Sequence, residues 1–510
     1  MNIGNRFLSG IIFGVSGTIL RVLLNLLLIP LMIRFLGMNN YGLYLFLLNI
    51  SDILVTMDIG LTNGLIHRLS HHMANIDTPN IKLQLCLGQW LYAGISVLIL
   101  LGGALSVPFL PFLFHFDTSS SSSINIFFIL VVIDAAINLY GCYFQSILKA
   151  HCLHQWTNIS ETFHAILINA FSVALLALGF GLLQIFIMRL VVTMLKNIYL
   201  LYGALKVEPL TLQANFNVSW QGLKELFGIS FYAMIMRIST FISYRIDFFV
   251  IASYLTMTDV GLYGLVTRLF NNVTDLCVKF TDALLPIFTR LTTLENRDQA
   301  RFFFLRINAF VSYLVIVLLA MILFNYPQII HFIGSGKISV SQILPVTLIV
   351  MPLTWSTITQ NPSNNYLFAA GYHRLQTFLT LAAALLNLII SVILVRYLGI
   401  LGVALGTLIP NIIQQQVITV IVTCHKLNIS FWNYLWVTYI KNLLSLGVLF
   451  TLLFLGKHIY GGSLYISVLI TGFAVVMSAV TWLFTSASSY EKERLMALIQ
   501  RPVKPIPLMD

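Results

Sequence analysis

Long apolar segments recur along the whole chain of 510 residues and limit its fold more than any other feature. A helix needs about 20 apolar residues to cross the roughly 30 Å hydrocarbon core of a bilayer. A window of that length finds about fourteen candidate spans. Their approximate bounds are 9–33, 41–66, 83–107, 123–148, 161–179, 182–205, 226–254, 259–289, 304–326, 340–369, 375–396, 401–424, 434–455 and 463–484. The chain is therefore predicted to be an all-α, multi-pass integral membrane protein.

The composition supports this prediction. Hydrophobic residues make up 58% of the chain and charged residues only 9%, whereas a soluble domain carries about 25% charged residues. The formal net charge is +11, an excess that suggests cytoplasmic anchoring, anionic lipid or an anionic substrate. The cysteines form no C-x-x-C pair, and no metal site is expected.

The Lys and Arg residues between the spans set the predicted orientation. Most of them lie in segments on the same side of the membrane as the N-terminus, and such an excess is typical of cytoplasmic loops. The opposite side holds only Arg34, Lys337, Arg396 and Lys457. An even number of spans returns the chain to its starting side, so both termini are predicted to be cytoplasmic.

Two short sequences repeat along the chain at nearly one offset. "FLGMNNYGLY" (Phe35–Tyr44) is answered about 220 residues later by "YLTMTDVGLY" (Tyr254–Tyr263), each after a long apolar segment. A second pair is "LGFG" (Leu178–Gly181) and "LGILG" (Leu398–Gly402). Six predicted helices form the repeating unit, and both copies enter the membrane from the same side because six is even. This predicts a parallel repeat of two six-helix lobes around a central cavity, followed by two additional C-terminal helices.

The predicted domain bounds follow from this repeat. An N-terminal lobe covers 1–206, a cytoplasmic linker 207–225 and a C-terminal lobe 226–424. The two additional helices cover 434–484, and a cytoplasmic tail covers 485–510. No hydrophilic loop reaches the roughly 50 residues of a small folded domain.

Three stretches resemble segments of bacterial polysaccharide-unit (O-antigen) flippases, a branch of the superfamily that also holds multidrug and toxin extrusion transporters and the lipid II flippase. The stretches are "RFLGMNNYGLYLFLLNISDILVTMDIGLTNGLIHRL" (Arg34–Leu69), "TDVGLYGLVTRLFNNVTDLCVKFTDALLPIFTRL" (Thr258–Leu291) and "YLGILGVALGT" (Tyr397–Thr407). The resemblance implies that the chain moves a polyprenyl-pyrophosphate-linked oligosaccharide across the bacterial cytoplasmic (inner) membrane by alternating access. It further implies a place in lipopolysaccharide or related surface-polysaccharide synthesis, with other assembly proteins as partners and no nucleic acid.

Charged side chains within the spans are expected to face a water-filled cavity or a partner, because each costs at least about 2.5–3.5 kcal/mol on insertion scales. On the eighth predicted helix, five polar residues follow the spacing i, i+4, i+7, i+11 and i+14, which puts them on one face. They are Arg268, Asn272, Asp275, Lys279 and Asp282. This face is predicted to line a cavity or to meet another polar helix.

The depth of the charges can be counted from the outer turn between the seventh and eighth helices. Arg237 and Asp275 lie at similar depth and could pair across the hairpin. Arg245 and Arg268 lie at one level. Two like charges at one level require neutralisation by Asp247 or by an anionic ligand.

Basic residues in the spans are candidates for binding a pyrophosphate or an anionic sugar, since Arg and Lys hold phosphate oxygens. For each of them an internal salt bridge is the alternative interpretation, whereas the set as a whole predicts a net basic cavity. The candidates are Arg21, Arg189, Lys196, Arg237, Arg245 and Arg268.

A second set of charged residues is assigned to ion coupling or to internal ion pairs. A buried carboxylate can take up a proton or a sodium ion, and coupling to such a gradient is the only cofactor-like requirement expected. Pairing with Arg or Lys is the favoured interpretation for each acid. The set comprises Asp52, Asp58, Asp134, Asp275, Lys279 and Asp282.

Two other functions are open from the sequence. A multidrug or metabolite efflux antiporter of the same superfamily is the nearest alternative, but the first helix carries Arg21 and no acid, which favours an anionic substrate. A membrane enzyme such as an O-antigen polymerase or ligase would need a sizeable outer loop with catalytic side chains. The sequence contains neither such a loop nor an H-E-x-x-H, G-x-x-x-x-G-K-[ST] or G-x-S-x-G motif. No enzymatic activity is expected.

Overall fold

The computed structural model describes residues 3–58, 60–75, 78–114, 121–209, 220–282, 284–293, 297–334, 336–459 and 464–486. Every regular element in these residues is a helix, and no strand occurs among them. The predicted all-α fold is therefore confirmed. Helices of this length suit a bilayer, because a helix satisfies all its backbone hydrogen bonds within one segment.

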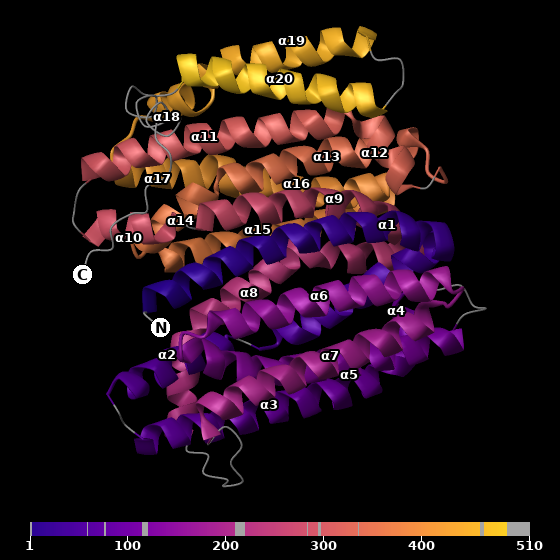
Figure 1. Ribbon diagram of the computed structural model, residues 1–510, viewed down its shortest axis with the longest axis vertical. Coiled ribbons are helices and arrows are strands. Elements are labelled where there is room, and N and C mark those ends of the chain that lie inside the picture. Colours follow the sequence, from indigo (N-terminus) through magenta and orange to yellow (C-terminus); the bar gives the residue numbers. More distant parts are fainter. Residues whose placement is uncertain are drawn as a thin grey trace. The chain divides into compact units, whose positions relative to one another are not determined.

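The helices follow the predicted apolar segments (Figure 1). Those up to residue 282 are α1 (Ile3–Thr56), α2 (Leu61–Ala74), α3 (Thr78–Ser106), α4 (Leu110–Leu113), α5 (Ser121–Ala150), α6 (His154–Ala177), α7 (Leu182–Val207), α8 (Trp220–Tyr254) and α9 (Met257–Asp282). The next are α10 (Leu285–Thr293), α11 (Arg297–Phe324), α12 (Tyr326–Ile333), α13 (Val340–Thr359), α14 (Asn361–Ala369), α15 (His373–Leu398) and α16 (Ile400–Asn411). A π-helix (Ile412–Thr419) leads into α17 (Val420–Leu427), α18 (Phe431–Thr438), α19 (Leu443–Ile459) and α20 (Leu464–Thr485).

Eleven helical segments among the described residues are long and apolar enough to cross a membrane, so the chain is a multi-pass membrane protein. The first of them, Leu27–Ala74, passes through Gly37, whose φ of 79° interrupts the helical backbone of α1. Helices α8 and α9 are 35 and 26 residues long and are not among these eleven segments. The number of fourteen spans stays a prediction.

The chain forms two compact units. The first unit contains Met1–Lys279, Ile330–Thr354 and Gly371–Gln414, and the second contains Phe280–Ile329, Trp355–Ala370 and Gln415–Asp510. Contacts in space between residues define these units, whereas the sequence defines the lobes 1–206 and 226–424 by the repeat. The division into lobes stays a prediction.

The two copies of the repeated sequence meet inside the first unit. A Cβ atom on Gly42 would overlap the carbonyl oxygen of Met257, and a Cβ atom on Gly261 would lie 2.8 Å from the carbonyl oxygen of Met38. The contact is reciprocal, since Met38 and Gly42 hold the same places in the first copy as Met257 and Gly261 in the second. The repeat that the sequence suggested therefore places α1 against α9 through two glycines, which allow close backbone approach.

Replacing Gly42 by alanine is expected to lower the free energy of unfolding by about 1–3 kcal/mol. The added methyl group would overlap the carbonyl oxygen of Met257, a backbone atom that cannot rotate away as a side chain can. The matched control is Gly94→Ala in α3, where a Cβ atom would meet nothing within 4 Å. Thermal unfolding in detergent micelles measures both variants. Equal melting temperatures for the two would contradict the close approach.

Within the first unit, α5 packs against α3 and α7, and the three helices lie side by side in Figure 1. Tyr143 Oη of α5 donates a hydrogen bond to the Leu85 carbonyl of α3 at 3.1 Å. Ser96 Oγ of α3 donates to the Ala136 carbonyl of α5, also at 3.1 Å. Such side-chain bonds between helices replace the hydrophobic driving force that lipid-exposed helices lack.

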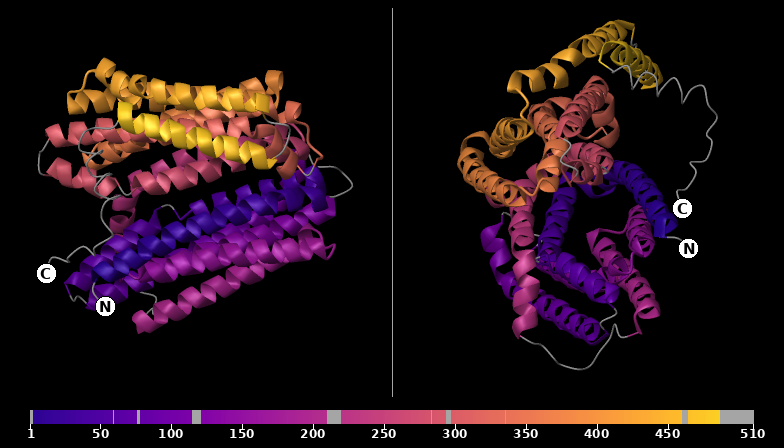
Figure 2. Two further views of the ribbon diagram at one scale, coloured as in Figure 1. Left: turned by 45° about the horizontal axis from the view of Figure 1, so that its top comes forward. Right: turned by 90° about the vertical axis from the view of Figure 1, so that its left-hand side faces the viewer.

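The core of the second unit joins α19 and α20 to α11. Figure 2 shows α19 and α20 as neighbouring helices at the yellow end of the chain. The ring of Trp482 in α20 stacks on Tyr313 of α11 with 5.5 Å between centroids. Trp482 Nε1 also donates to Asn442 Oδ1 at 2.9 Å, and Asn442 Nδ2 donates to the Ala309 carbonyl at 2.9 Å. The last two long helices are thus fixed to their own unit by buried contacts.

Candidate functional site

A polar cavity of about 370 Å³ lies within the first unit, between α1, α6, α7, α8 and α9. Its volume falls in the range of about 300–1,000 Å³ that is usual for ligand sites. Three of the five polar residues predicted on one face of α9 line it, namely Arg268, Asn272 and Asp275. The spacing on α9 therefore identified one wall of the cavity.

The charged lining of the cavity is formally balanced when His164 is neutral. Among the described residues it consists of three arginines and three carboxylates, which are Arg189, Arg245, Arg268, Asp52, Glu161 and Asp275. The net basic cavity stays a prediction, since two of the basic candidates are Arg21 and Arg237. The side chains of those two candidates, and of Lys279 and Asp282, lie outside the described residues.

Arg245 of α8 reaches across to α1. Its Nη2 atom lies 3.1 Å from Asp52 Oδ2, and its Nη1 atom donates to Asn49 Oδ1 at 3.0 Å. Both charged side chains remain nearly half exposed, at 42% for Arg245 and 48% for Asp52. Water and a ligand can therefore compete with this ion pair.

Arg189 of α7 is fixed by a buried acid. Its Nε atom lies 2.9 Å from Asp134 Oδ2 on α5, and the side chain of Asp134 is only 3% exposed. The other carboxylate oxygen, Oδ1, is buried without a hydrogen-bond partner. This pair joins two helices behind the cavity, and it commits the Arg189 charge to a structural role.

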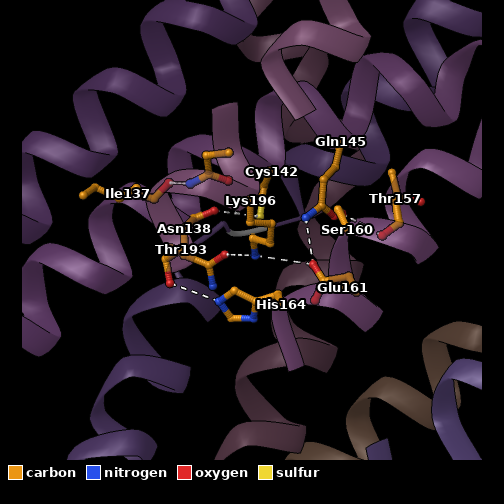
Figure 3. A network of polar contacts seen from close by, with 11 residues as sticks. Ile137, Asn138, Cys142, Gln145, Thr157, Ser160, Glu161, His164, Thr193 and Lys196 are labelled. Carbon is orange, nitrogen blue, oxygen red and sulfur yellow. Dashed lines mark hydrogen bonds and ion pairs between the residues drawn. The ribbon is translucent and has the colours of Figure 1, made fainter. Parts of the chain in front are cut away.

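Lys196 lies seven residues after Arg189 on the same face of α7, but it does not line the cavity and is buried in a polar network (Figure 3). Lys196 Nζ donates to Asn138 Oδ1 at 2.6 Å and lies 3.5 Å from Glu161 Oε1. Gln145 Nε2 donates to the same Glu161 oxygen at 3.0 Å. The Lys196 charge is thus used within the protein.

Arg268 differs from these three basic residues. It lines the cavity and is partly buried. In the part of the chain that the structure describes, its guanidinium forms no hydrogen bond and no ion pair. A partly buried guanidinium without an acidic partner is costly in a membrane-embedded cavity, so this group is available for an anionic ligand.

Two acids of the first unit are held by hydroxyl groups. Tyr92 Oη donates to Asp58 Oδ1 at 2.7 Å. Asp247 accepts hydrogen bonds from Tyr263 and from Thr407 Oγ1, the latter at 2.7 Å. Neither acid lines the cavity. Asp247 is therefore not the neutralising group that the sequence hypothesis allowed.

Glu161 and His164 are lining residues that the sequence analysis did not select. They begin a stripe on α6 that continues with Ala165, Ile168 and Asn169, all of which line the cavity. The spacing i, i+3, i+4, i+7 and i+8 is that of one helix face. The pattern is visible in the sequence, but Glu161 stands at the edge of its predicted span, so the sequence gives no sign that it faces a cavity.

No group of three or more His, Cys, Asp and Glu side chains could hold a metal ion within the described ranges. The uncharged polar groups of the cavity are mainly amides, from Asn49, Asn169, Asn271 and Asn272. Amides both donate and accept hydrogen bonds, as sugar hydroxyls do. The arrangement can therefore hold an anionic group at Arg268 and hydroxyl groups beside it.

Comparison with known proteins adds a family and a fold. A family model described as "Polysaccharide biosynthesis protein" matches residues 7–292. The structure of the lipid II flippase MurJ in an inward closed conformation is similar, with a TM-score of 0.70 at 14% identity over 92% of this chain and 99% of that chain. An inward-facing multidrug resistance MATE family transporter of the MOP superfamily has a TM-score of 0.69 at 14% identity, over 82% and 98%.

A further similar structure is a MOP superfamily transporter from Pyrococcus furiosus Vc1, described as having a binding pocket of reverse polarity. Its TM-score is 0.57 at 13% identity, over 82% of this chain and 95% of that chain. At these identities the likeness is one of fold. No curated protein sequence matches the chain.

Proposed function

Because the chain belongs to the polysaccharide biosynthesis protein family, we propose that it is a flippase for a polyprenyl-pyrophosphate-linked oligosaccharide. The substrate is an O-antigen or related surface-polysaccharide repeat unit. It moves from the cytoplasmic to the periplasmic leaflet of the bacterial inner membrane by alternating access, and both termini of the chain are cytoplasmic.

The observation that carries this proposal is Arg268. Arg189, Lys196 and Arg245 each have an acidic partner. Arg268 has none among the described residues. A guanidinium binds phosphate oxygens with two parallel hydrogen bonds, so a pyrophosphate supplies the anionic partner that Arg268 lacks among the described residues.

The neighbouring groups suit the rest of the proposed substrate. Asn271 and Asn272 stand on the same helix as Arg268, and Asn49 faces the same cavity. Their amides can bind sugar hydroxyls next to the pyrophosphate. The proposal includes energy from a proton or sodium gradient, for which the intramembrane carboxylates of the predicted coupling set are the candidate groups.

The alternative function is a multidrug or metabolite efflux antiporter. The three carboxylates in the cavity lining would favour a cationic substrate. However, Asp52 is in contact with Arg245, and Glu161 with Lys196. These two acids are therefore compensated already, and we favour the anionic substrate.

The experiment uses a strain that lacks this chain. Its membrane lipids are extracted and analysed by mass spectrometry for a polyprenyl-pyrophosphate oligosaccharide. Accumulation that is reversed by wild type and by Arg396→Gln, but not by Arg268→Gln, supports the proposal. Arg396 is a matched control because it is exposed and lines neither this cavity nor its neighbour. No accumulation, together with altered sensitivity to toxic cations, would reject the flippase and favour the exporter.

A further inference from the structure

A second cavity of about 750 Å³ lies in the first unit, and most of its lining is apolar. One wall is formed by Leu24, Leu27, Leu28, Pro30 and Leu31 of α1, and a second by Ala170 and Val173 of α6. Phe332 contributes from another part of the same unit, and the polar side chains of the described lining are Arg34, Asn169 and His331. No carboxylate belongs to the described lining. We call this cavity the apolar groove.

The apolar groove adjoins the polar cavity. Leu28 and Asn169 line both, and both residues are buried. Leu28 is nine residues from Gly37 and Asn169 is nine residues from Leu178, so each lies about 13–14 Å from a predicted outer turn. The junction of the two cavities is therefore formed at one level by α1 and α6.

The apolar groove is also open at its surface. Leu27 and Phe332 line it, and they are 55% and 58% exposed. In a bilayer such side chains contact hydrocarbon, so an apolar ligand that is longer than the groove can continue into the lipid. A site of this kind suits a flexible apolar ligand better than a compact one, because the ligand can extend past the exposed Leu27 and Phe332 into the lipid.

We propose that the apolar groove binds the isoprenoid chain of the substrate next to its pyrophosphate. This inference rests on the proposed function. The isoprenoid is covalently bonded to the pyrophosphate, so the isoprenoid site must adjoin the pyrophosphate site at Arg268. The shared residues Leu28 and Asn169 provide that junction. Burial of the isoprenoid against α1 and α6 adds binding affinity, and this contribution does not involve the charged residues of the polar cavity.

The test compares a ligand that has the chain with one that lacks it. The probes are a long-chain polyprenyl pyrophosphate and inorganic pyrophosphate, titrated on the purified full-length protein and followed by native mass spectrometry. The variants Val173→Trp and Ala170→Trp fill the apolar groove from α6 at two positions, so one informative variant remains if the other fails to fold. The control is Val191→Trp, an exposed valine of α7 that lines neither cavity.

The expected result is that both groove variants bind polyprenyl pyrophosphate about ten-fold more weakly than wild type, a difference of about 1.4 kcal/mol. Their affinity for inorganic pyrophosphate is expected to be unchanged, and Val191→Trp is expected to match wild type with both probes. Arg268→Gln is expected to weaken binding of both probes.

Three outcomes would overturn the inference. Groove variants that bind polyprenyl pyrophosphate as well as wild type, while Arg268→Gln does not, would reject the groove and leave the proposed function standing. Displacement of bound phosphatidylethanolamine by the tryptophans, with no effect on polyprenyl pyrophosphate, would make the groove a site for bilayer lipid. Failure of wild type to bind either pyrophosphate probe would reject the inference and the proposed function together.

Discussion

Replacing Asp134 by alanine is expected to lower the free energy of unfolding by about 3–5 kcal/mol. The variant leaves Arg189 with its guanidinium buried between α5 and α7 and without the carboxylate that lies 2.9 Å from its Nε atom. The side chain of Arg189 is only 16% exposed, so water replaces the lost partner poorly. Thermal unfolding in detergent micelles measures the loss.

Two comparisons isolate the cause of this effect. Asp298→Ala removes an acid that is 92% exposed and pairs with Arg301 at 3.6 Å, and a loss of about 1 kcal/mol or less is expected. The double variant Asp134→Leu/Arg189→Leu removes both charges and is expected to be more stable than Asp134→Ala, because no uncompensated charge remains. Similar small losses for Asp134→Ala and Asp298→Ala would show that Arg189 is not held as the structure describes.

Arg268→Gln is expected to weaken binding of polyprenyl pyrophosphate by about ten- to a hundred-fold. This loss corresponds to the contribution of about 1.5–3 kcal/mol that hydrogen bonds to a charged group make. The same change is expected to leave the unliganded protein as stable as wild type or slightly more stable. Arg268 has no acidic partner to lose among the described residues, and removal of an uncompensated charge relieves a cost.

Ligand-dependent thermal unfolding measures both parts of this prediction, since a ligand that binds the folded state raises the melting temperature. The substrate is expected to stabilise wild type strongly and Arg268→Gln weakly. Arg268→Lys is expected to be intermediate, because it keeps the charge but loses the planar, bidentate geometry. Arg245→Gln serves as the comparison, since its guanidinium is already bound to Asp52. A larger effect at Arg245 than at Arg268 would contradict the assignment.

Local sequence patterns predicted the parts of the structure that depend on one helix or one turn. Apolar length predicted the helices, and the spacing on α9 predicted a polar wall with Arg268 and Asp275. The repeated "GLY" sequences indicated a parallel repeat. The structure adds that Gly42 and Gly261 are themselves the contact between the two copies.

Partners on different helices could not be predicted from spacing. Arg189 and Asp134 are 55 residues apart in the chain, and Arg245 and Asn49 are 196 apart, so only packing brings them together. The same limit explains why Arg268 was one of six equal candidates. Arg268 becomes distinct only in the structure, where Arg189, Lys196 and Arg245 have acidic partners and Arg268 has none among the described residues.

The most direct test of the flippase is a transport measurement in sealed vesicles that contain the purified protein and a polyprenyl-pyrophosphate oligosaccharide. A membrane-impermeant glycosidase added outside cleaves only the oligosaccharide in the outer leaflet. Wild-type vesicles are expected to expose more oligosaccharide over time than protein-free vesicles, while vesicles with Arg268→Gln stay close to the protein-free level. Equal cleavage in wild-type and protein-free vesicles, under an imposed proton or sodium gradient of either direction, would contradict the central claim.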